Sequence, residues 1–354
     1  MVRVVLRGLS LCVLMACLPR VSSAQSFLLD LPLRSQAAEV SQRIGITDIT
    51  IKYHRPLVGD RKFWDGVVPY GRVWRAGANI NTTISFSDPV MIDGKSLEKG
   101  TYGLHILSNA DEWTIIFSKN STSWGSFSYD QSEDALRINV KPRAADMHEA
   151  LTFDFDQVQA DSAVVELEWE KIAVSFKVSV DVHSLMLASL KRQLRTLSGY
   201  TWTSWNDAAN YLLAEKGDLD EALTYADRSI KMEDRFDNEM TKAKVLTALD
   251  RKDEASTAQK KALDVATPRE TDQFAHELLA EKHNEEAFAI FRDNAAKHPG
   301  QWFVHEGLTQ MYSEQGKFSD AEREIKVALT GAPDSEKARL EGLRKKLEAK
   351  QPIN

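Results

Sequence analysis

The spacing of apolar residues changes once along the chain, near residue 183, and this change constrains the fold more than any other feature. Before it, apolar and polar residues alternate, and many of the apolar residues are β-branched or aromatic. After it, apolar residues recur every three or four positions, as in Leu187, Leu190 and Leu194. The sequence therefore predicts an all-β domain followed by an all-α domain.

The first half contains about eight alternating segments, typical of short strands. Turn signals such as Asp93-Gly94 and Lys99-Gly100 separate them, and no helical pattern intervenes. We therefore expect an antiparallel sandwich or barrel over residues 25–183. The clearest segments are 49–53, 83–86, 113–117, 136–140, 164–169 and 174–180.

Small residues recur at nearly constant spacing in the second half. An alanine in an acidic context returns at intervals of 33, 32 and 34 residues, at Ala222, Ala255, Ala287 and Ala321. The spacing resembles that of the tetratricopeptide repeat, a pair of helices that spans about 34 residues. Small residues are needed where the two helices cross closely. We therefore expect an all-α solenoid with four degenerate tetratricopeptide-like repeats over residues 205–333.

The remaining segments of the second half complete this organisation. Residues 184–204 are expected to form a connecting helix, capped by Ser184 and ended by Gly199, and a linker. Gly217 and Gly316 fit the turns inside two repeats, with Asp250 and Lys282 in their place in the other two. The charged residues 334–354 predict the polar capping helix and tail that a solenoid needs.

The first 24 residues have the pattern of a secretory signal peptide. Arg3 and Arg7 precede an apolar stretch at 9–18, and Ser22-Ser23-Ala24 fits a cleavage site. The apolar stretch is far shorter than the roughly 20 residues that span a bilayer. We expect cleavage after Ala24 and an exported protein, periplasmic or secreted. Both cysteines lie in this segment, so the mature chain would contain no disulfide, thiol nucleophile or cysteine-metal site.

Two other interpretations of this segment stay open. Leu14-Met15-Ala16-Cys17 resembles a lipoprotein box, in which Cys17 would be lipidated and would attach the protein to a membrane. The segment would otherwise be a buried N-terminal helix. We expect a membrane partner only if Cys17 is lipidated.

The charge balance bears on the partners of the protein. The 354 residues include 45 basic and 52 acidic ones, for a net charge of −7. Binding to nucleic acid needs a basic face. We therefore expect no nucleic-acid partner.

Residues 52–79 form a basic-aromatic stretch inside the acidic first half, with six basic and two acidic residues. Arginines can bind a carboxylate, phosphate or sulfate, and aromatic faces suit a sugar. The alternative is a self-satisfied stack of arginines on tryptophans that closes one end of the domain. The candidate ligand-binding residues are Arg55, Arg61, Trp64, Tyr70, Trp74, Arg75, Asn79 and, outside the stretch, His105.

The same stretch carries a family resemblance. Its residues Arg55-Pro56, Val68-Pro69-Tyr70-Gly71, Val73-Trp74-Arg75 and Gly77-Ala78-Asn79, followed by Lys99-Gly100-Thr101-Tyr102, are similar to the signature of domain of unknown function 2911. The resemblance covers roughly residues 35–181. It implies an exported bacterial protein, in some members with helical repeats after the domain. It implies no established activity.

Patterns for catalysis or metal binding are weak. His54, His105 and His148 lack the close ligand spacing of a zinc site. Glu166 and Glu168 fit a solvated strand surface better than a pair of glycosidase carboxylates. The sequence contains neither a nucleophile elbow nor a glycine-rich phosphate loop. We therefore expect no metal and no cofactor, and catalytic residues stay unassigned.

These observations favour an exported binding or scaffold protein of the cell envelope. The helical repeats would take a protein or peptide segment on their concave face, and the basic-aromatic stretch would take an anionic or glycan ligand. Two alternatives stay open. One is an envelope hydrolase with Arg75, Asn79 and His105 in its site, and the other is a purely structural envelope component.

Overall fold

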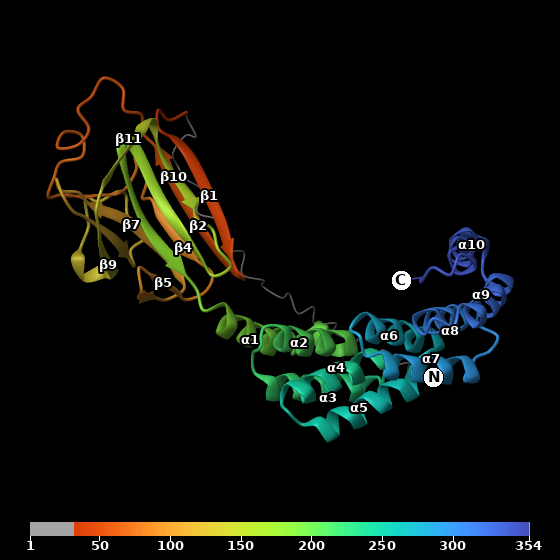
Figure 1. The fold of residues 1–354 in the computed structure, drawn as a ribbon. Helices are drawn as coiled ribbons and strands as arrows, with labels where there is room; N and C mark the ends of the chain where they lie inside the picture. The colour runs from red at the N-terminus through yellow and green to blue at the C-terminus, as the bar shows by residue number, and fades with distance from the viewer. Residues whose placement is uncertain (1–31, 354) are drawn as a thin grey trace, which may run out of the picture. The chain divides into compact units, whose positions relative to one another are not determined.

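The computed structural model describes residues 32–353, which form two compact units, one up to Val180 and one from Asp181 (Figure 1). The predicted signal peptide and both cysteines lie outside the described residues. Among residues 32–353, no helix has the length and apolar character needed to cross a bilayer.

The N-terminal unit consists of two antiparallel sheets. The seven-stranded sheet has the order β1-β2-β4-β7-β8-β9, and β3 pairs with β7. Its strands are β1 (Gln36–Ile44), β2 (Thr47–Arg55), β3 (Val73–Trp74), β4 (Thr83–Phe86), β7 (Gly100–Leu107), β8 (Trp113–Ser118) and β9 (Asp134–Val140). The four-stranded sheet, in the order β10-β11-β5-β6, contains β5 (Val90–Ile92), β6 (Lys95–Leu97), β10 (Arg143–Asp156) and β11 (Ser162–Ser179). Neither sheet closes on itself, so the described strands form a sandwich and not a barrel.

The core of this unit lies between the two sheets. Alternation along β2 turns Ile49, Ile51 and Tyr53 inward. The Tyr53 ring lies 4.9 Å from that of Phe153 on β10, and the Phe117 ring of β8 lies 5.6 Å from that of Phe176 on β11. These contacts join the sheets through apolar burial, the dominant favourable term in folding.

Strand β11 replaces two strands expected from the sequence. Its buried apolar residues are odd-numbered from Ala163 to Trp169 and even-numbered from Val174 onward. Between them Glu170 has a φ of 55°, and the pairing with β10 shifts register nearby. A bulge of this kind reverses the alternation while keeping the same face of the strand turned to the core. The interrupted pattern therefore belongs to one continuous strand.

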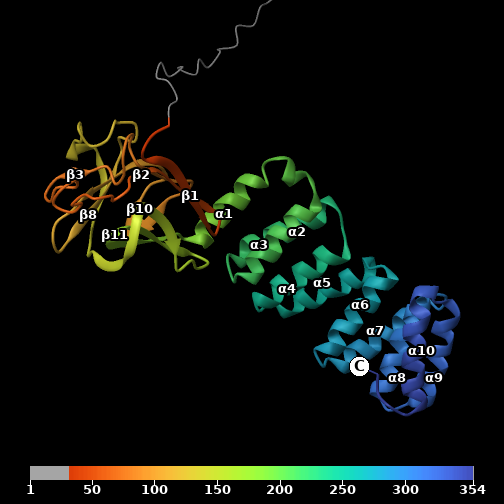
Figure 2. The ribbon, with the colours of Figure 1, turned by 90° about the horizontal axis from the view of Figure 1, so that it is seen from above.

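The C-terminal unit consists of helices, which stack in successive pairs (Figures 1 and 2). A first helix, α1 (Val182–Gln193), is followed by the 3₁₀ turn η2 (Leu197–Tyr200). The pairs are α2 (Trp202–Ala214) with α3 (Leu219–Met232), α4 (Phe236–Ala248) with α5 (Lys252–Val265), α6 (Pro268–Ala280) with α7 (Asn284–Lys297), and α8 (Trp302–Glu314) with α9 (Phe318–Gly331). A final helix, α10 (Asp334–Glu348), packs on α9.

The recurring alanines occupy the helix contacts inside the pairs. Ala222, Ala255, Ala287 and Ala321 are all buried, between 0% and 7% exposed. A second small residue recurs in the first helix of each pair and is also buried. It is Ala209, Ala243 and Ala275 in the first three pairs and Thr309 in the fourth. This confirms the predicted fold class, a β-sandwich followed by helical repeats that resemble tetratricopeptide repeats.

Two local details differ from the sequence-based expectations. Helix α1 is capped by Asp181, whose Oδ1 accepts a hydrogen bond from the Ser184 backbone at 3.0 Å, and it ends at Gln193, well before Gly199. The left-handed residue in the turn of the first repeat is Lys216, at φ 51°, and not Gly217. Gly217 instead leaves room for His183, because a Cβ there would lie 2.6 Å from its ring.

Candidate functional site

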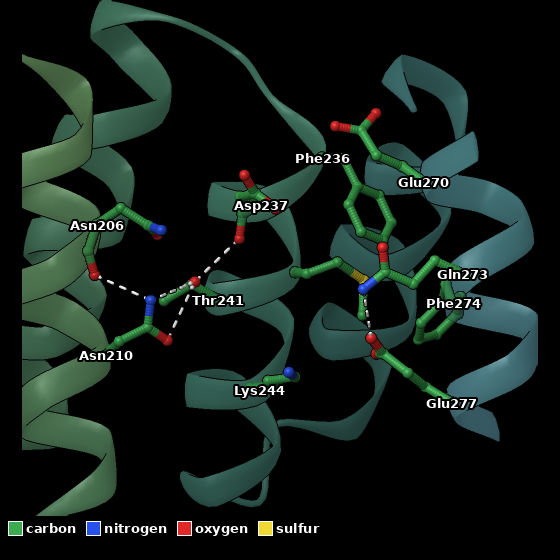
Figure 3. Close-up of a pocket in the computed structure, with 11 residues that line it drawn as sticks. Asn206, Asn210, Phe236, Asp237, Thr241, Lys244, Glu270, Gln273, Phe274 and Glu277 are labelled. Carbon is green, nitrogen blue, oxygen red and sulfur yellow. Dashed lines mark hydrogen bonds between the residues drawn. The ribbon is translucent and has the colours of Figure 1, made fainter. Parts of the chain in front are cut away.

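A pocket of about 270 Å³ opens on the face formed by α2, α4 and α6, the first helices of three successive repeats (Figure 3). The lining residues are Asn206, Asn210, Phe236, Asp237, Met240, Thr241, Lys244, Glu270, Gln273, Phe274 and Glu277.

Large apolar side chains form one side of this pocket. The rings of Phe236 on α4 and Phe274 on α6 lie 6.0 Å apart in an edge-to-face arrangement, and Met240 lies in the same buried cluster as Phe274. The backbones of α4 and α6 approach each other less closely than those of α2 and α4. Bulky residues at a helix contact increase the distance between helix axes, so these side chains account for the opening.

Amide and hydroxyl groups form the other side (Figure 3). The Nδ2 of Asn210 donates to the Asn206 carbonyl and to Thr241 Oγ1, each at 3.1 Å. Thr241 Oγ1 also donates to the Asp237 carbonyl at 2.9 Å. The side-chain oxygen of Asn206 is buried and accepts no hydrogen bond from the described residues. Because buried polar atoms normally have a partner, this unpaired oxygen is an unusual feature of the pocket wall.

The charge of the pocket is unbalanced. Lys244 is its one cation, whereas Asp237, Glu270 and Glu277 contribute carboxylates. One Glu270 oxygen already accepts from the Thr267 backbone at 2.7 Å, and Glu277 accepts from Gln273 at 3.2 Å. The remaining negative potential favours neutral or cationic ligands.

The fold brings together only some of the candidate residues of the basic-aromatic stretch. Arg61, Trp74 and Arg75 line one cavity of about 560 Å³. Arg61 donates to the Leu57 and Val58 carbonyls at 2.5 and 3.2 Å. Arg55 donates to the Leu151 carbonyl at 2.9 Å and to Thr152 at 2.7 Å. These two guanidinium groups therefore hold backbone segments in place, which differs from the expected convergence of three arginines on a ligand.

The other candidates of this stretch lie in different surroundings. Trp64 is buried against Trp113, with ring centres 4.6 Å apart. Trp74 stacks on Trp169 at 5.5 Å and donates to the Gly77 carbonyl at 3.0 Å. Asn79, at φ 56°, donates to the Ser35 carbonyl at 3.1 Å, and Tyr70 lies at the surface. Trp64 and Trp74 therefore contribute to the packing of the sandwich.

His105 and Arg75 are the two candidates whose ionisation is perturbed. Burial lowers the pKa of His105 to about 4, although the charge of Asp134 opposes the shift. Its Nδ1 lies 2.8 Å from Ser126 Oγ. A serine hydrolase would need a serine–histidine contact of this kind, but a base with that pKa accepts a proton poorly at neutral pH. Burial also lowers the pKa of Arg75, whose Nε has no partner among the described residues.

Sequence reasoning did not find the pocket between α2, α4 and α6. Asn206 and Asn210 are four residues apart, so they share a helix face, and this spacing was the available signal. The phenylalanines resembled ordinary core residues, since apolar spacing does not distinguish a helix contact from a pocket wall. Within residues 32–353, no group of three or more potential metal-ligating side chains is placed to hold an ion.

Among known protein families, one matches the N-terminal unit. Residues 35–178 match the family described as a protein of unknown function, DUF2911. No protein of the curated collection matches the chain.

Solved structures with some likeness to the chain are helical-repeat proteins. YrrB, described as a TPR protein with an unusual peptide-binding site, has 12% identity over 45% of this chain and 82% of its own, at a TM-score of 0.29. PilF of Pseudomonas aeruginosa has 16% identity over 44% of this chain and 71% of its own, at 0.30. TTC0263, a TPR protein of Thermus thermophilus, has 16% identity over 48% and 89%, at 0.29. At such TM-scores these likenesses define no function, and the helical repeats are assigned from the helix pairs and buried alanines.

Proposed function

We propose that this protein is an exported binding protein whose helical repeats hold a segment of a partner protein. The observation that carries the proposal is the polar and apolar pocket on α2, α4 and α6, with an unpartnered Asn206 oxygen beside the Phe236–Phe274 pair. Stacked helical repeats present extended binding surfaces. Amide side chains can pair with the backbone of an extended segment while the aromatic pair packs on an apolar side chain.

The charge of the pocket supports a more specific proposal about the sequence of the partner segment. Three carboxylates against one ammonium favour a segment that carries lysine or arginine beside an apolar residue. A peptide library displayed on phage and selected against the mature chain, residues 25–354, tests this. We expect enrichment of peptides with a basic residue next to an apolar one.

Two matched variants distinguish peptide binding in the pocket from nonspecific peptide binding elsewhere on the surface. Asn210→Ala removes the amide that donates to Thr241 and Asn206, and we expect it to weaken peptide binding about tenfold. Asn284→Ala changes an exposed asparagine at the start of α7 and is expected to leave binding unchanged. Equal binding by both variants, or enrichment of acidic peptides, would contradict the proposal.

Export is the second part of the proposal. The basic start, the short apolar stretch and Ser22-Ser23-Ala24 support cleavage after Ala24 and a periplasmic or secreted location. The intact mass of the protein recovered from its producing cells tests this. A chain that begins at Gln25 agrees with the proposal, a lipidated chain that begins at Cys17 supports the lipoprotein alternative, and an uncleaved chain contradicts both. The anionic or glycan ligand expected on the β domain stays a prediction.

A further inference from the structure

A second cavity lies on the N-terminal unit, on the face of the seven-stranded sheet that is turned away from the other sheet. It has a volume of about 670 Å³ and is formed by β1, β2, the residues just before β4 and the loop that follows β8. Its lining includes Lys52, His54, Ile80, Asn81, Ser123 and Trp124. We call it the sheet-face cleft. It shares no lining residue with the pocket of the helical unit.

Two buried polar side chains line the sheet-face cleft, and each has one polar atom without a hydrogen-bond partner. His54 is 8% exposed, and its Nδ1 makes no hydrogen bond with the described residues. Asn81 is 6% exposed, and its side-chain oxygen is likewise unpartnered. A buried polar atom without a partner is destabilising. Both residues also line the cleft, where their side chains can hydrogen-bond to a hydroxyl-bearing ligand.

Exposed apolar side chains stand beside these polar groups. Trp124 is 65% exposed and Ile80 is 57% exposed, and both line the cleft. The Phe127 ring stacks on Trp124 with centres 5.4 Å apart and planes 17° apart. A contiguous patch of exposed apolar side chains is typical of a ligand-binding groove.

The loop that carries these rings is held in place by the sheet. Asn81 Nδ2 donates to the Asn120 carbonyl at 3.3 Å, and His105 Nδ1 lies 2.8 Å from Ser126 Oγ. Arg75 lies over the Phe127 ring, 6.0 Å from its centre. A loop with three anchors presents its rings in a fixed arrangement, which lowers the entropy cost of binding.

The charges at the cleft cancel. Lys52 and Glu39 are the charged residues of its lining, and their side chains form an ion pair at 3.2 Å. Burial, together with the charge of Arg75, lowers the pKa of His54, so its ring is neutral at neutral pH. An anion would meet no free cation in this lining, and a purely aliphatic ligand would leave His54 and Asn81 unpaired.

We propose that the sheet-face cleft binds a neutral sugar, with a sugar ring packed on Trp124 and its hydroxyl groups hydrogen-bonded to His54 and Asn81. A sugar combines an apolar ring face with hydroxyl groups that both donate and accept. Pockets with apolar walls and a few placed polar groups recognise ligands of this mixed character. The inference is independent of the partner proposed for the helical repeats.

An array of bacterial, plant and fungal oligosaccharides tests the proposal, with the mature chain applied to it and the strongest hit titrated by calorimetry. We expect retention on at least one neutral oligosaccharide. Trp124→Ala is expected to weaken its Kd about tenfold or more because the stacking surface is lost. The control is Tyr200→Ala, which removes an aromatic ring that is 80% exposed outside the cleft and should leave Kd unchanged.

A second measurement does not depend on a substitution. The ring ¹⁵N resonances of His54 should shift when the hit oligosaccharide is added, because the sugar hydroxyl groups hydrogen-bond to the imidazole ring. Retention on no oligosaccharide, equal affinity in Trp124→Ala, or an unmoved His54 resonance would overturn the proposal. Binding confined to peptides or to inorganic phosphate would overturn it as well.

Discussion

The guanidinium carbon of Arg75 lies 6.0 Å from the centre of the Phe127 ring, so a cation between β3 and β4 supports an aromatic ring on the loop after β8. The Arg75 side chain also lies against the backbone of this loop at Gly125. A Cβ on Gly125 would lie 2.8 Å from Arg75 Nη1, and Gly125 also has a φ of 72°. Arg75 therefore supports the loop that carries Phe127.

The same charge acts on a neighbouring histidine. Burial is the main cause that lowers the pKa of His54, and the charge of Arg75 lowers it further. Removing this charge in Arg75→Met should raise the pKa of His54, although burial should keep it below the usual 6.5. An NMR titration of the His54 ring measures this. The control is Arg61→Met, because the guanidinium of Arg61 is bound to backbone carbonyls. In this control the pKa of His54 should stay as in the wild type. An unchanged pKa of His54 in Arg75→Met would contradict the electrostatic effect of Arg75.

His105 makes the stability of the β-sandwich depend on pH. Its pKa is about 4 in the folded unit, against 6.5 for a free histidine. Between these values the unfolded chain binds a proton that the folded chain does not, so the free energy of unfolding falls as the pH is lowered from 6.5 to 4. At about 1.36 kcal/mol per pKa unit, this single group accounts for a loss of about 3 kcal/mol.

The variant His105→Asn isolates this contribution because asparagine does not titrate. Urea unfolding, followed through the near-ultraviolet signal of the buried tryptophans, gives the free energy of unfolding at each pH. The wild type should lose about 3 kcal/mol more than His105→Asn between pH 6.5 and 4. Parallel pH curves for the two proteins would show that His105 titrates normally.

Much of the fold was predictable because it depends on patterns of burial. Alternation and the spacing of Ala222, Ala255, Ala287 and Ala321 each report a buried face. The continuity of β11 was not predictable, since a left-handed Glu170 leaves no mark in the sequence beyond a change of phase. Local propensity cannot distinguish a bulge from a break between two strands.

The candidate site was less predictable than the fold. Residue types showed that the stretch with Arg55, Arg61 and Arg75 is basic, but not that two of these side chains are bound to backbone carbonyls. Those partners include Leu151, which is 96 residues away from Arg55 in the sequence. Only the three-dimensional fold decides which polar groups are already paired, and therefore which are free for a ligand.

The repeat turns predict opposite effects of glycine at equivalent positions. Lys282 has a φ of 67° and Gly316 a φ of 70°, each in the turn between the two helices of a repeat. Left-handed backbone costs a non-glycine residue about 1–2 kcal/mol, part of which the greater freedom of glycine in the unfolded chain offsets. Lys282→Gly should therefore stabilise the helical unit by about 0.5 kcal/mol. Gly316→Ala should destabilise it by about 1 kcal/mol, although its Cβ would meet no atom within 4 Å.

Thermal unfolding followed by circular dichroism at the helical band measures these changes. Lys260→Gly is the control for lysine-to-glycine replacement, since Lys260 lies within α5. There glycine should cost about 1 kcal/mol. Loss of stability in Lys282→Gly similar to that in Lys260→Gly would contradict the left-handed turn.

Alanine substitutions at two glycines, one in a close helix contact and one at an open position, test the packing between the third and fourth repeats. A Cβ on Gly307, in α8, would lie 2.5 Å from the Phe291 ring of α7 and 2.7 Å from Asp272 Oδ1 of α6. Gly342, in α10, has no atom within 4 Å of the same position. Alanine favours a helix over glycine by about 1 kcal/mol, but overpacking a close contact costs about 1–3 kcal/mol. Gly342→Ala should therefore raise the melting temperature of the helical unit, whereas Gly307→Ala should lower it. A rise in both variants would mean that α8 does not approach Phe291 closely, and the repeat packing would be wrong.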